Sequence, residues 1–319
     1  MPIDIPLVVI CGPTASGKSE AGLILAQKLK SEIISADSRQ IYKYMDIGTA
    51  KPGEHERNLV RHHFIDIIEP DQSYNAGQFQ KDSLPIIESL RKHQKIPLMV
   101  GGTGLYIRAA VYGLFSGPPS NASIKATLKK IIAEKGVYSL FQELKTIDPK
   151  TAAHIHHNDK QRIMRALEVY YTTGETISSL HTQHNPYKPL RPTLIFLLHP
   201  PREQLYRRIE QRVDSMMKQG FLDEVKHLLR KGYTKDDPGM QSLGYRILTQ
   251  HCEDKTSLTI AVSLIKRDTR HYAKRQMTWF RQERKAQIIH MTESTSPSQI
   301  ADIIEKIINQ NVNNNQCKS

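Results

Sequence analysis

The run Gly12–Ser19, with the sequence GPTASGKS, constrains the fold more than any other part of this 319-residue chain. It follows an apolar segment, residues 7–11, and precedes a segment that reads as a helix from Ser19 to about Lys30. A G-x-x-x-x-G-K-S run between a strand and a helix is the pattern of a phosphate-binding loop, or P-loop. The glycines let the backbone curl until its N–H groups point inward at an anion, at the positive end of the helix dipole. The pattern therefore predicts a site for a di- or triphosphate.

Every position of the run is expected to hold phosphate oxygens. Lys18 adds a full positive charge, and the hydroxyl of Ser19 is placed to ligate Mg²⁺, which makes Mg²⁺ the expected cofactor. The candidate phosphate-binding residues are Gly12, Pro13, Thr14, Ala15, Ser16, Gly17, Lys18 and Ser19.

The charge balance points to a partner larger than a nucleotide. The chain has 45 Lys and Arg against 32 Asp and Glu, a net charge of +13. A P-loop does not require that excess, which favours a polyanion, most simply a nucleic acid, although a merely basic protein would have the same composition. The cysteines, Cys11, Cys252 and Cys317, are far apart, so neither a zinc knuckle nor a disulfide framework is indicated. With no signal peptide and no apolar run near ~18 residues, we expect a cytoplasmic monomer with no membrane partner.

Apolar segments alternate with helical patterns on either side of a central stretch. The segments 32–36, 64–68, 96–100 and 193–198 read as strands, and 202–220 and 265–285 as helices. This alternation predicts an α/β fold, a P-loop NTPase-like parallel sheet flanked by helices. After the linker signal at 117–121 the patterns are helical up to about Gly174, which predicts an inserted all-helical domain. The expected domains are a core of 1–119 plus 191–290, the insertion 120–190, and a C-terminal helix with a frayed tail, 291–319.

Two strand ends carry candidate chemistry. Asp37 follows the strand 32–36, and the carboxyl ends of parallel strands carry ligands, so Asp37 should face the P-loop across a cleft. A lone Asp in this position is also common as a cap or a turn residue. The strand 96–100 ends on a Gly-Gly-Thr-Gly turn where ATP-driven proteins often carry an acidic residue. Such a turn lets backbone approach a ligand, and Thr103 offers it a hydroxyl.

Cations recur on both late helices. Arg212 lies in the Arg-rich segment 202–220, and an arginine beside a P-loop can close on the phosphates. The segment 265–285 interleaves cations with Tyr272, Trp279 and Phe280, a pattern that suits contact with a nucleic-acid backbone. Lys274, Arg275 and Arg281 are its candidate contacts.

Taken in order, these motifs resemble the tRNA dimethylallyltransferase family in its short bacterial form. The resemblance rests on GPTASGKS at 12–19, DSRQIY at 37–42, MDIGTAKP at 45–52, GGTGLY at 101–106, QRxxRALEV at 161–169 and KRQMTWF at 274–280. The cysteine–histidine set of a zinc finger, found in eukaryotic relatives, does not follow Trp279. The resemblance implies transfer of a dimethylallyl group from dimethylallyl diphosphate to N6 of the adenine immediately 3′ of the tRNA anticodon. The P-loop would then hold a prenyl diphosphate rather than ATP, which fits the missing acidic residue.

The resemblance also implies roles for single residues. Asp37 would be the general base for N6, Thr103 would lie near the acceptor amine, and Arg212 with the P-loop would stabilise the departing diphosphate. The adenine must be flipped out of its stack to reach them. The implied contacts to the anticodon stem–loop are Ser38, Arg39, Gln40, Gln161, Arg162, Ile163, Met164 and Arg165.

Two other functions remain open at this point. A small-molecule kinase with the same P-loop would turn over ATP and would need neither the insertion nor the basic helix. A non-catalytic RNA-binding NTPase switch would need an acidic, Mg²⁺-holding strand end, and the sequence does not offer one.

Overall fold

The computed structural model describes residues 5–114, 117–118, 120–181 and 188–316, and it divides into two compact units. The core unit comprises Met1–Val111 and Pro189–Ser319, and the helical unit comprises Tyr112–Lys188. The chain leaves and re-enters the core side by side, because the N–H of Leu190 donates to the carbonyl of Val111 at 2.8 Å. The predicted limits of 120 and 190 placed the start of the insertion too late. Residue 119 and residues 182–187 of the predicted insertion lie outside the described residues.

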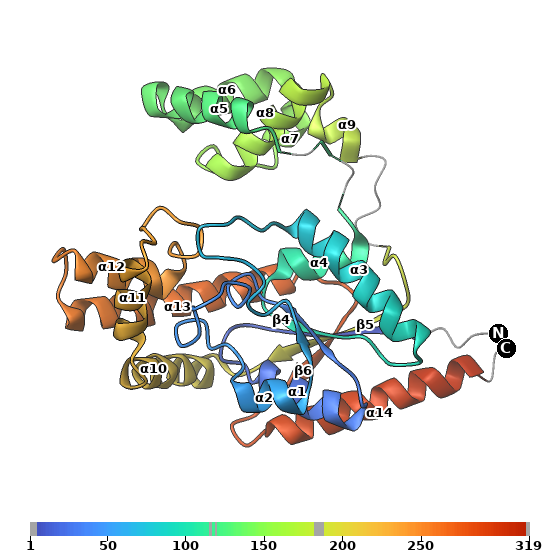
Figure 1. The fold of residues 1–319 in the computed structure, drawn as a ribbon. Coiled ribbons are helices and arrows are strands. Elements are labelled where there is room, and N and C mark those ends of the chain that lie inside the picture. Colours follow the sequence, from blue (N-terminus) through green and yellow to red (C-terminus); the bar gives the residue numbers. More distant parts are fainter. Residues whose placement is uncertain (1–4, 115–116, 119, 182–187, 317–319) are drawn as a thin grey trace. The chain divides into compact units, whose positions relative to one another are not determined.

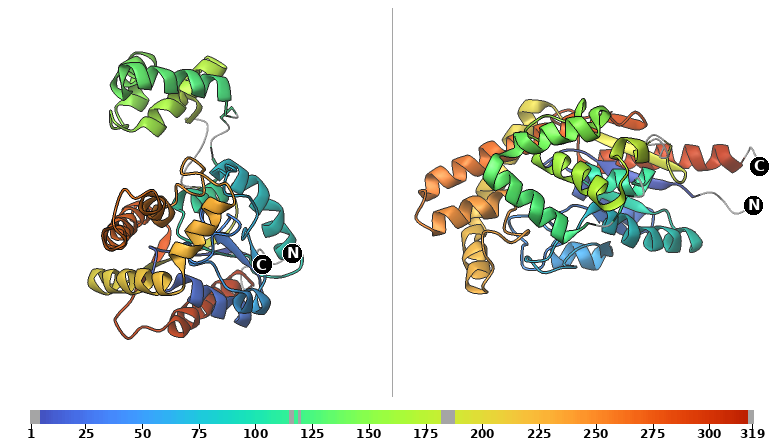
Figure 2. Two further views of the ribbon diagram at one scale, coloured as in Figure 1. Left: turned by 60° about the vertical axis from the view of Figure 1, so that its left-hand side comes forward. Right: turned by 90° about the horizontal axis from the view of Figure 1, so that it is seen from above.

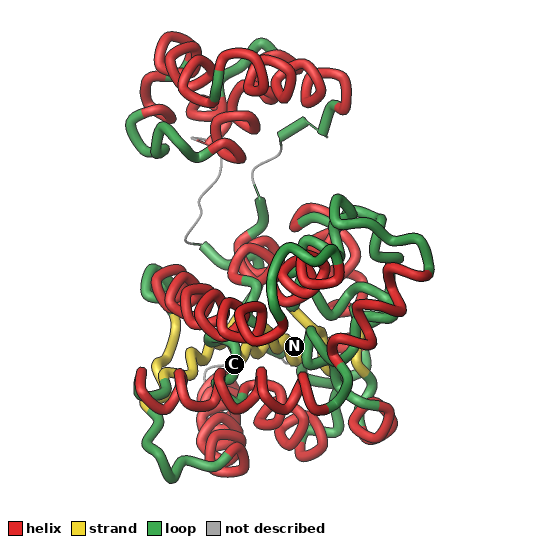
Figure 3. Tube along the Cα trace, turned by 90° about the vertical axis from the view of Figure 1, so that its left-hand side faces the viewer, coloured by secondary structure: helices red, strands yellow, loops and turns green. Residues whose placement is uncertain are grey.

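The core unit is built on one six-stranded sheet with the order β3-β2-β4-β1-β5-β6. Its strands are β1 (Leu7–Cys11), β2 (Ile33–Ala36), β3 (His62–His63), β4 (Leu98–Gly101), β5 (Thr193–His199) and β6 (Ala286–His290). Every pairing is parallel. Continuous apolar strands suit such a sheet, because helices bury both of its faces. Figure 3 shows the strands enclosed between helices.

Two helices cover one face of the sheet. These are α1 (Lys18–Lys28) and α14 (Pro297–Gln316), which pack on each other and on the strands. Val8 and Ile10 of β1 point to this face, together with Leu25 of α1 and Ile304 of α14, all 0% exposed. On the other side of the sheet lie α3 (Ala76–Lys92), α4 (Gly104–Tyr112) and α13 (Leu258–Phe280) (Figure 1). The ring of Phe79 in α3 stacks on that of Tyr106 in α4, 4.5 Å between centroids.

The remaining core helices gather beside α13. They are α10 (Arg202–Lys218), α11 (Phe221–Arg230) and α12 (Leu243–Cys252), while the short α2 (Glu54–Leu59) precedes β3. Both α10 and α12 pack against α13, and α11 packs against α10 and α12 (Figures 1 and 2). This group supplies one side of the cavity described below.

The helical unit consists, in its described residues, of helices alone. They are α5 (Ala122–Lys135), α6 (Val137–Ile147), α7 (Pro149–Ala152), α8 (Lys160–Thr173) and α9 (Ile177–His181). Leu128, Leu140 and Leu167 form part of its own apolar core. The carboxylate of Glu168, 1% exposed, accepts hydrogen bonds from Ser120 Oγ and Asn121 N. This buried acceptor fixes the start of α5 on α8.

Four sequence-based expectations need correction. Residues 64–68 do not form a strand, because Phe64 and Asp66 have φ of 64° and 56°. The edge strand β6 was not predicted. The segment 291–319 is not separate, because α14 packs on α1 within the core unit. In place of the frayed tail expected within 291–319, the helix continues to Gln316, and residues 317–319, with Cys317, lie outside the described residues. Across the described helices, none has the length and apolarity needed to cross a membrane.

The packing of α14 can be tested with adjacent isoleucines. Ile304 is 0% exposed and Ile303 is 44% exposed. Ile304→Ala should lower the free energy of unfolding by about 2–5 kcal/mol, because it leaves a cavity against α1. Ile303→Ala should change it by about 0.5 kcal/mol or less. Urea denaturation followed by circular dichroism measures both, and equal effects would show that α14 is not part of the core.

Candidate active site

The P-loop joins β1 to α1, the strand–loop–helix order that the sequence predicts. Gly17, with φ of 85°, lies directly before Lys18, the first residue of α1. Only glycine adopts this backbone conformation without strain. Ala15 has φ of 62°, and the N–H of Ser16 donates to the carbonyl of Pro13 at 3.3 Å. The loop thus curls tightly over the start of α1, where the positive end of the helix dipole lies.

Lys18 is folded back along this loop. Its Nζ donates to the carbonyl of Pro13 at 3.1 Å. Burial lowers the pKa of Lys18 to about 8, an effect that the nearby charge of Asp37 opposes. Ser19 is exposed and lines the cavity in front of the loop. The ammonium and the hydroxyl are therefore both available to an anion in that cavity.

Gln276 of α13 ties the P-loop to the turn after β4. Its Oε1 accepts from the N–H of Thr14 at 2.9 Å, and its Nε2 donates to the carbonyl of Gly102 at 2.9 Å. Gln276 is 6% exposed. The side-chain amide therefore fixes one strand end against another.

Asp37 is held in a tight turn at the end of β2. Its Oδ1 accepts from the N–H groups of Arg39 and Gln40, at 2.8 and 3.4 Å. These bonds occupy Oδ1, and Asp37 lines the same cavity as Lys18. Thr103 Oγ1 accepts from the N–H of Ser38 at 3.0 Å, which joins the ends of β4 and β2. Neither Thr103 nor Ser38 is among the residues that line this cavity.

The cavity has a volume of about 450 Å³. Its lining combines the P-loop, Asp37 and Arg212 with apolar side chains, many of them from α10 to α13. Burial lowers the pKa of Arg212, and the charge of Asp37 opposes this. Within the described residues, the guanidinium of Arg212 has no hydrogen bond or ion pair. The apolar lining residues from these helices are Ile209, Val213, Met216, Phe221, Leu243 and Ile265, and Leu23, Ile33 and Val100 line the cavity from α1, β2 and β4.

Such a cavity suits a ligand with an anionic end and a small apolar end. Lys18, Arg212 and the P-loop can neutralise phosphate charge, while the apolar side chains of the lining can enclose a hydrocarbon group. Among the described residues, no group of three or more His, Cys, Asp or Glu side chains could hold a metal ion. The single hydroxyl of Ser19 fits Mg²⁺ that takes most of its ligands from phosphate and water.

The predicted contacts on α13 lie at its surface. Lys274, Arg275 and Arg281 are all exposed. The guanidinium of Arg275 lies 5.8 Å from the ring centroid of Tyr272, and Tyr272 also lines the cavity. Burial raises the pKa of Tyr272 to about 12, so its hydroxyl stays protonated at neutral pH. The cations are thus free of the cavity and open to a partner.

In the helical unit the predicted contacts fall into two sets. Gln161 and Arg162 are exposed. Arg165 donates to Glu168 Oε2 and to the carbonyl of Pro118, so it also holds the unit's own fold. Ile163 and Met164, 0% and 7% exposed, lie in the apolar core. Their side chains are turned inward by α8, and the RNA contact at these two positions stays a prediction.

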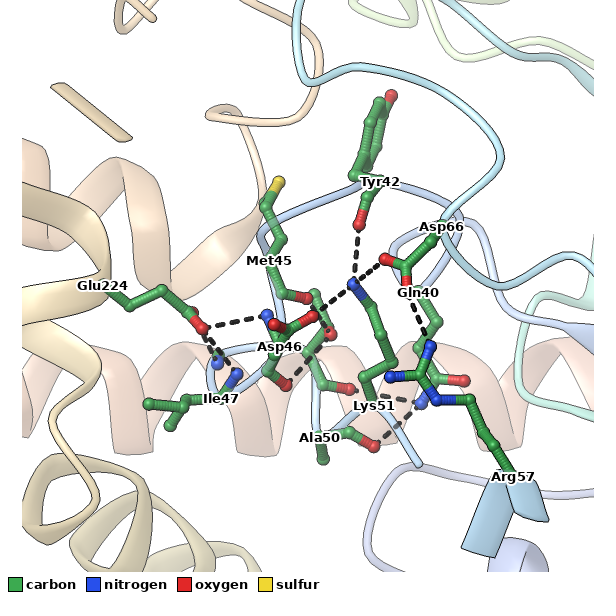
Figure 4. A network of polar contacts seen from close by, with 12 residues as sticks. Gln40, Tyr42, Met45, Asp46, Ile47, Ala50, Lys51, Arg57, Asp66 and Glu224 are labelled. Atoms are coloured by element: carbon green, nitrogen blue, oxygen red, sulfur yellow. Dashed lines mark hydrogen bonds and ion pairs between the residues drawn. The ribbon is translucent and has the colours of Figure 1, made fainter. Parts of the chain in front are cut away.

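Sequence reasoning missed three residues that shape the site. Gln276 could have been found, because it is a polar residue at the apolar spacing of Ala273 and Phe280. Glu224 could not, since the N–H groups that it bonds lie more than 170 residues away. Lys51 lies in the motif 45–52, but no local pattern shows that its ammonium is buried against Tyr42, Asp46 and Asp66. Figure 4 shows these two residues with the loop 46–52, which lines the cavity.

The fold defines a P-loop-like α/β protein with an inserted helical unit. A sequence profile described as IPP transferase matches residues 40–283, and the chain belongs to that family. A tRNA dimethylallyltransferase of Syntrophobacter fumaroxidans is 46% identical over 88% of this chain and 82% of its own length. One from Carboxydothermus hydrogenoformans is 46% identical over 97% of this chain and 98% of its own.

Solved structures agree over nearly the whole chain. A full-length tRNA isopentenylpyrophosphate transferase from Bacillus halodurans has a TM-score of 0.72 and 35% identity, covering 98% of both chains. A eukaryotic dimethylallyltransferase acting on tRNA has a TM-score of 0.81 and 28% identity, covering 96% of this chain and 80% of its own. The likeness therefore includes the sheet and the inserted helices.

The charge on Lys18 should control affinity for a diphosphate. Lys18→Ala should weaken binding of dimethylallyl diphosphate roughly 10- to 100-fold, the loss of one charge-assisted contact. In the parental chain the ammonium is present below pH 8 and is lost above it, so affinity should fall as pH rises through about 8. Lys18→Arg keeps its charge and should show no such fall. Isothermal titration across pH measures this, and unchanged affinity in Lys18→Ala would contradict the role.

Proposed function

We propose that the chain transfers the dimethylallyl group of dimethylallyl diphosphate to N6 of the adenine immediately 3′ of the anticodon in tRNA. The observation that carries the proposal is one cavity lined by the P-loop, Arg212 and Asp37 together with apolar side chains. Relatives named tRNA dimethylallyltransferase, similar over nearly the full chain, support it.

The donor would bind with its diphosphate against the P-loop and Arg212, and with its hydrocarbon group against the apolar side chains of the cavity. An exocyclic adenine amine is a weak nucleophile, so the allylic carbon has to be made electrophilic. Charge that develops on the departing diphosphate would meet the P-loop N–H groups, Lys18 and Arg212. Mg²⁺, with Ser19 as its protein ligand, would add electrostatic stabilisation of that diphosphate when bound.

The acceptor adenine would place its N6 amine next to Asp37. Oδ1 is engaged by the Asp37 turn, which leaves Oδ2 as the oxygen to take the proton from N6. The bond between N6 and the allylic carbon forms, the bond from that carbon to the diphosphate oxygen breaks, and one proton passes to the carboxylate. Thr103 would act one step away, by holding Ser38 beside this turn. The cytoplasmic monomer expected from the sequence stays a prediction.

The kinase alternative loses its support, because the similar proteins are prenyltransferases. The direct test uses radiolabelled dimethylallyl diphosphate with an anticodon stem–loop that has or lacks the target adenine. Label should enter only the RNA that carries it. ATP turnover with a small-molecule acceptor and no label in RNA would overturn the proposal.

Asp37→Asn separates the base role from its alternatives. The amide keeps the shape but cannot accept a proton, so the single-turnover rate should fall roughly 10²- to 10⁴-fold. Affinities for donor and RNA should change little, because the charge is used as the bond forms. Weaker Mg²⁺ binding with partial rescue by excess Mg²⁺ would point to a metal role. A near-normal rate would exclude the base role.

The exposed cations of α13 should contribute to RNA binding by charge. Replacing Lys274, Arg275 and Arg281 with Ala should reduce the slope of log affinity against log salt by roughly 0.7–0.9 per lost phosphate contact. Lys30, Lys81 and Lys92 are also exposed but lie on other elements. Their triple Ala variant has the same charge change and should retain the parental slope. Fluorescence anisotropy with an anticodon stem–loop measures both, and equal slopes would show that α13 makes no phosphate contact.

A further inference from the structure

The loop 46–52 forms a wall of the cavity without regular secondary structure. Gly48, Thr49, Ala50, Lys51 and Pro52 all line the cavity. Ala50 has φ of 49°, an unfavourable backbone conformation for alanine. A Cβ at Gly48 would lie 2.1 Å from the ring of Phe221, so the wall packs directly on α11. A strained loop of this kind keeps its shape only if its surroundings hold it.

A carboxylate from α11 holds the first half of this wall. Glu224 Oε2 accepts from the N–H groups of Asp46 and Ile47, at 2.9 and 2.8 Å. Its Oε1 accepts from the N–H of Gly48 at 3.1 Å and from the hydroxyl of Tyr245 at 2.5 Å. Figure 4 shows the side chain of Glu224 directed at the backbone of the loop. Glu224 is not among the residues that line the cavity. Hydrogen bonds to an ionised acceptor are about twice as strong as neutral ones, so this carboxylate is a firm anchor.

A buried ammonium holds the second half. The side chain of Lys51 is 1% exposed, and Nζ donates to the carbonyl of Tyr42 at 2.8 Å. It also pairs with Asp46 and Asp66, each at 2.5 Å. Arg57 pairs with the other oxygen of Asp66 at 2.7 Å. Each of the three N–H donors of the Lys51 ammonium thus has an acceptor, so side-chain contacts hold both halves of the wall 46–52.

Gln40 connects the wall to the turn that carries Asp37. Its Nε2 donates to the carbonyls of Thr49 and Ala50, at 3.3 and 2.9 Å. Its own N–H donates to Asp37 Oδ1 at 3.4 Å. A shift of the wall 46–52 would therefore move Gln40 and, through this hydrogen bond, the carboxylate of Asp37.

We infer that Glu224 is a positioning residue, which sets the wall 46–52 and, through Gln40, the place of Asp37 in the cavity. The inference rests on the proposed base role of Asp37. Glu224 does not itself meet donor or acceptor, so its contribution appears in the rate of the chemical step and not in binding.

Glu224→Gln tests the inference with little change of shape. One carboxylate oxygen becomes an NH₂ group that faces N–H or O–H donors, so one side of the anchor is lost. The single-turnover rate should fall about 10- to 100-fold, as a displacement of roughly 1 Å in a reacting group produces. Affinities for dimethylallyl diphosphate and for the anticodon stem–loop should stay within about threefold. A parental rate in folded Glu224→Gln would overturn the inference.

Glu69→Gln is the matched control. Glu69 also accepts from a tyrosine of the α11–α12 region, Tyr233, and pairs with Lys43, both at 2.8 Å. It makes no bond to the wall, so its variant should keep the parental rate, whatever it does to thermal stability. An equal loss of rate in both variants would show a general effect of removing charge and would overturn the inference.

A double variant tests the route through Asp37. In an Asp37→Asn background, Glu224→Gln should lower the single-turnover rate by less than about a further threefold, because the group that it positions no longer accepts a proton. A fully multiplicative loss would overturn this route. A near-normal rate in Asp37→Asn alone would instead overturn the base role.

If Glu224→Gln does not fold, Tyr245→Phe serves in its place, because it removes one of the donors to Glu224. A rate three- to tenfold lower is expected; a parental rate there would overturn the inference.

Discussion

A P-loop that keeps backbone N–H groups free for a ligand can make few bonds of its own, so its shape also depends on bonds from elsewhere. Beside the contacts to the carbonyl of Pro13, Gln276 supplies two such bonds: its side chain takes the N–H of Thr14 and the carbonyl of Gly102 at once. Because Gln276 is on α13, the same helix that presents cations at the surface also locks β1 against β4 at the site. The end of β2 joins this frame through Thr103 and Ser38. Three strand ends are thereby held as one body, and the placement of Lys18 and Asp37 follows from it.

The charges inside the cavity are balanced around Asp37. Burial lowers the pKa of both Lys18 and Arg212, and in each case the carboxylate of Asp37 opposes the shift. A diphosphate on the P-loop would bring far more negative charge than Asp37 and would raise the pKa of Lys18. The cations would then be neutralised by the donor, leaving Asp37 less engaged by them. The same two cations therefore face both the diphosphate of the donor and Asp37.

How much of this could be read from the sequence depended on the distance between partners. The strand, P-loop and helix at 7–28 lie next to one another, and Asp37 follows from the rule for parallel strand ends. Glu224 could not be predicted, since it bonds N–H groups more than 170 residues away. The strand expected at 64–68 was wrong because the segment turns to bond Gln40 and Ile41, which no local pattern reveals. Ile163 and Met164 were taken from the family motif, although the helical spacing already placed Ile163 on the apolar face with Ala166 and Leu167.

The wall 46–52 shows why a fold would maintain strained backbone at this place. Each residue in an unfavourable backbone region costs about 1–3 kcal/mol, and Ala50 and Asp66 are both such residues. The charged contacts of Glu224 and Lys51 are each of the kind that contributes about 1.5–3 kcal/mol, so the strain can be offset. The result is a wall whose N–H groups at 46–48 and carbonyls at 49 and 50 are already bonded. Such a wall offers few backbone groups to draw water in. In the proposed reaction an activated allylic carbon beside it would react with whatever nucleophile is present, so a rigid wall with satisfied backbone groups would favour the adenine amine over water.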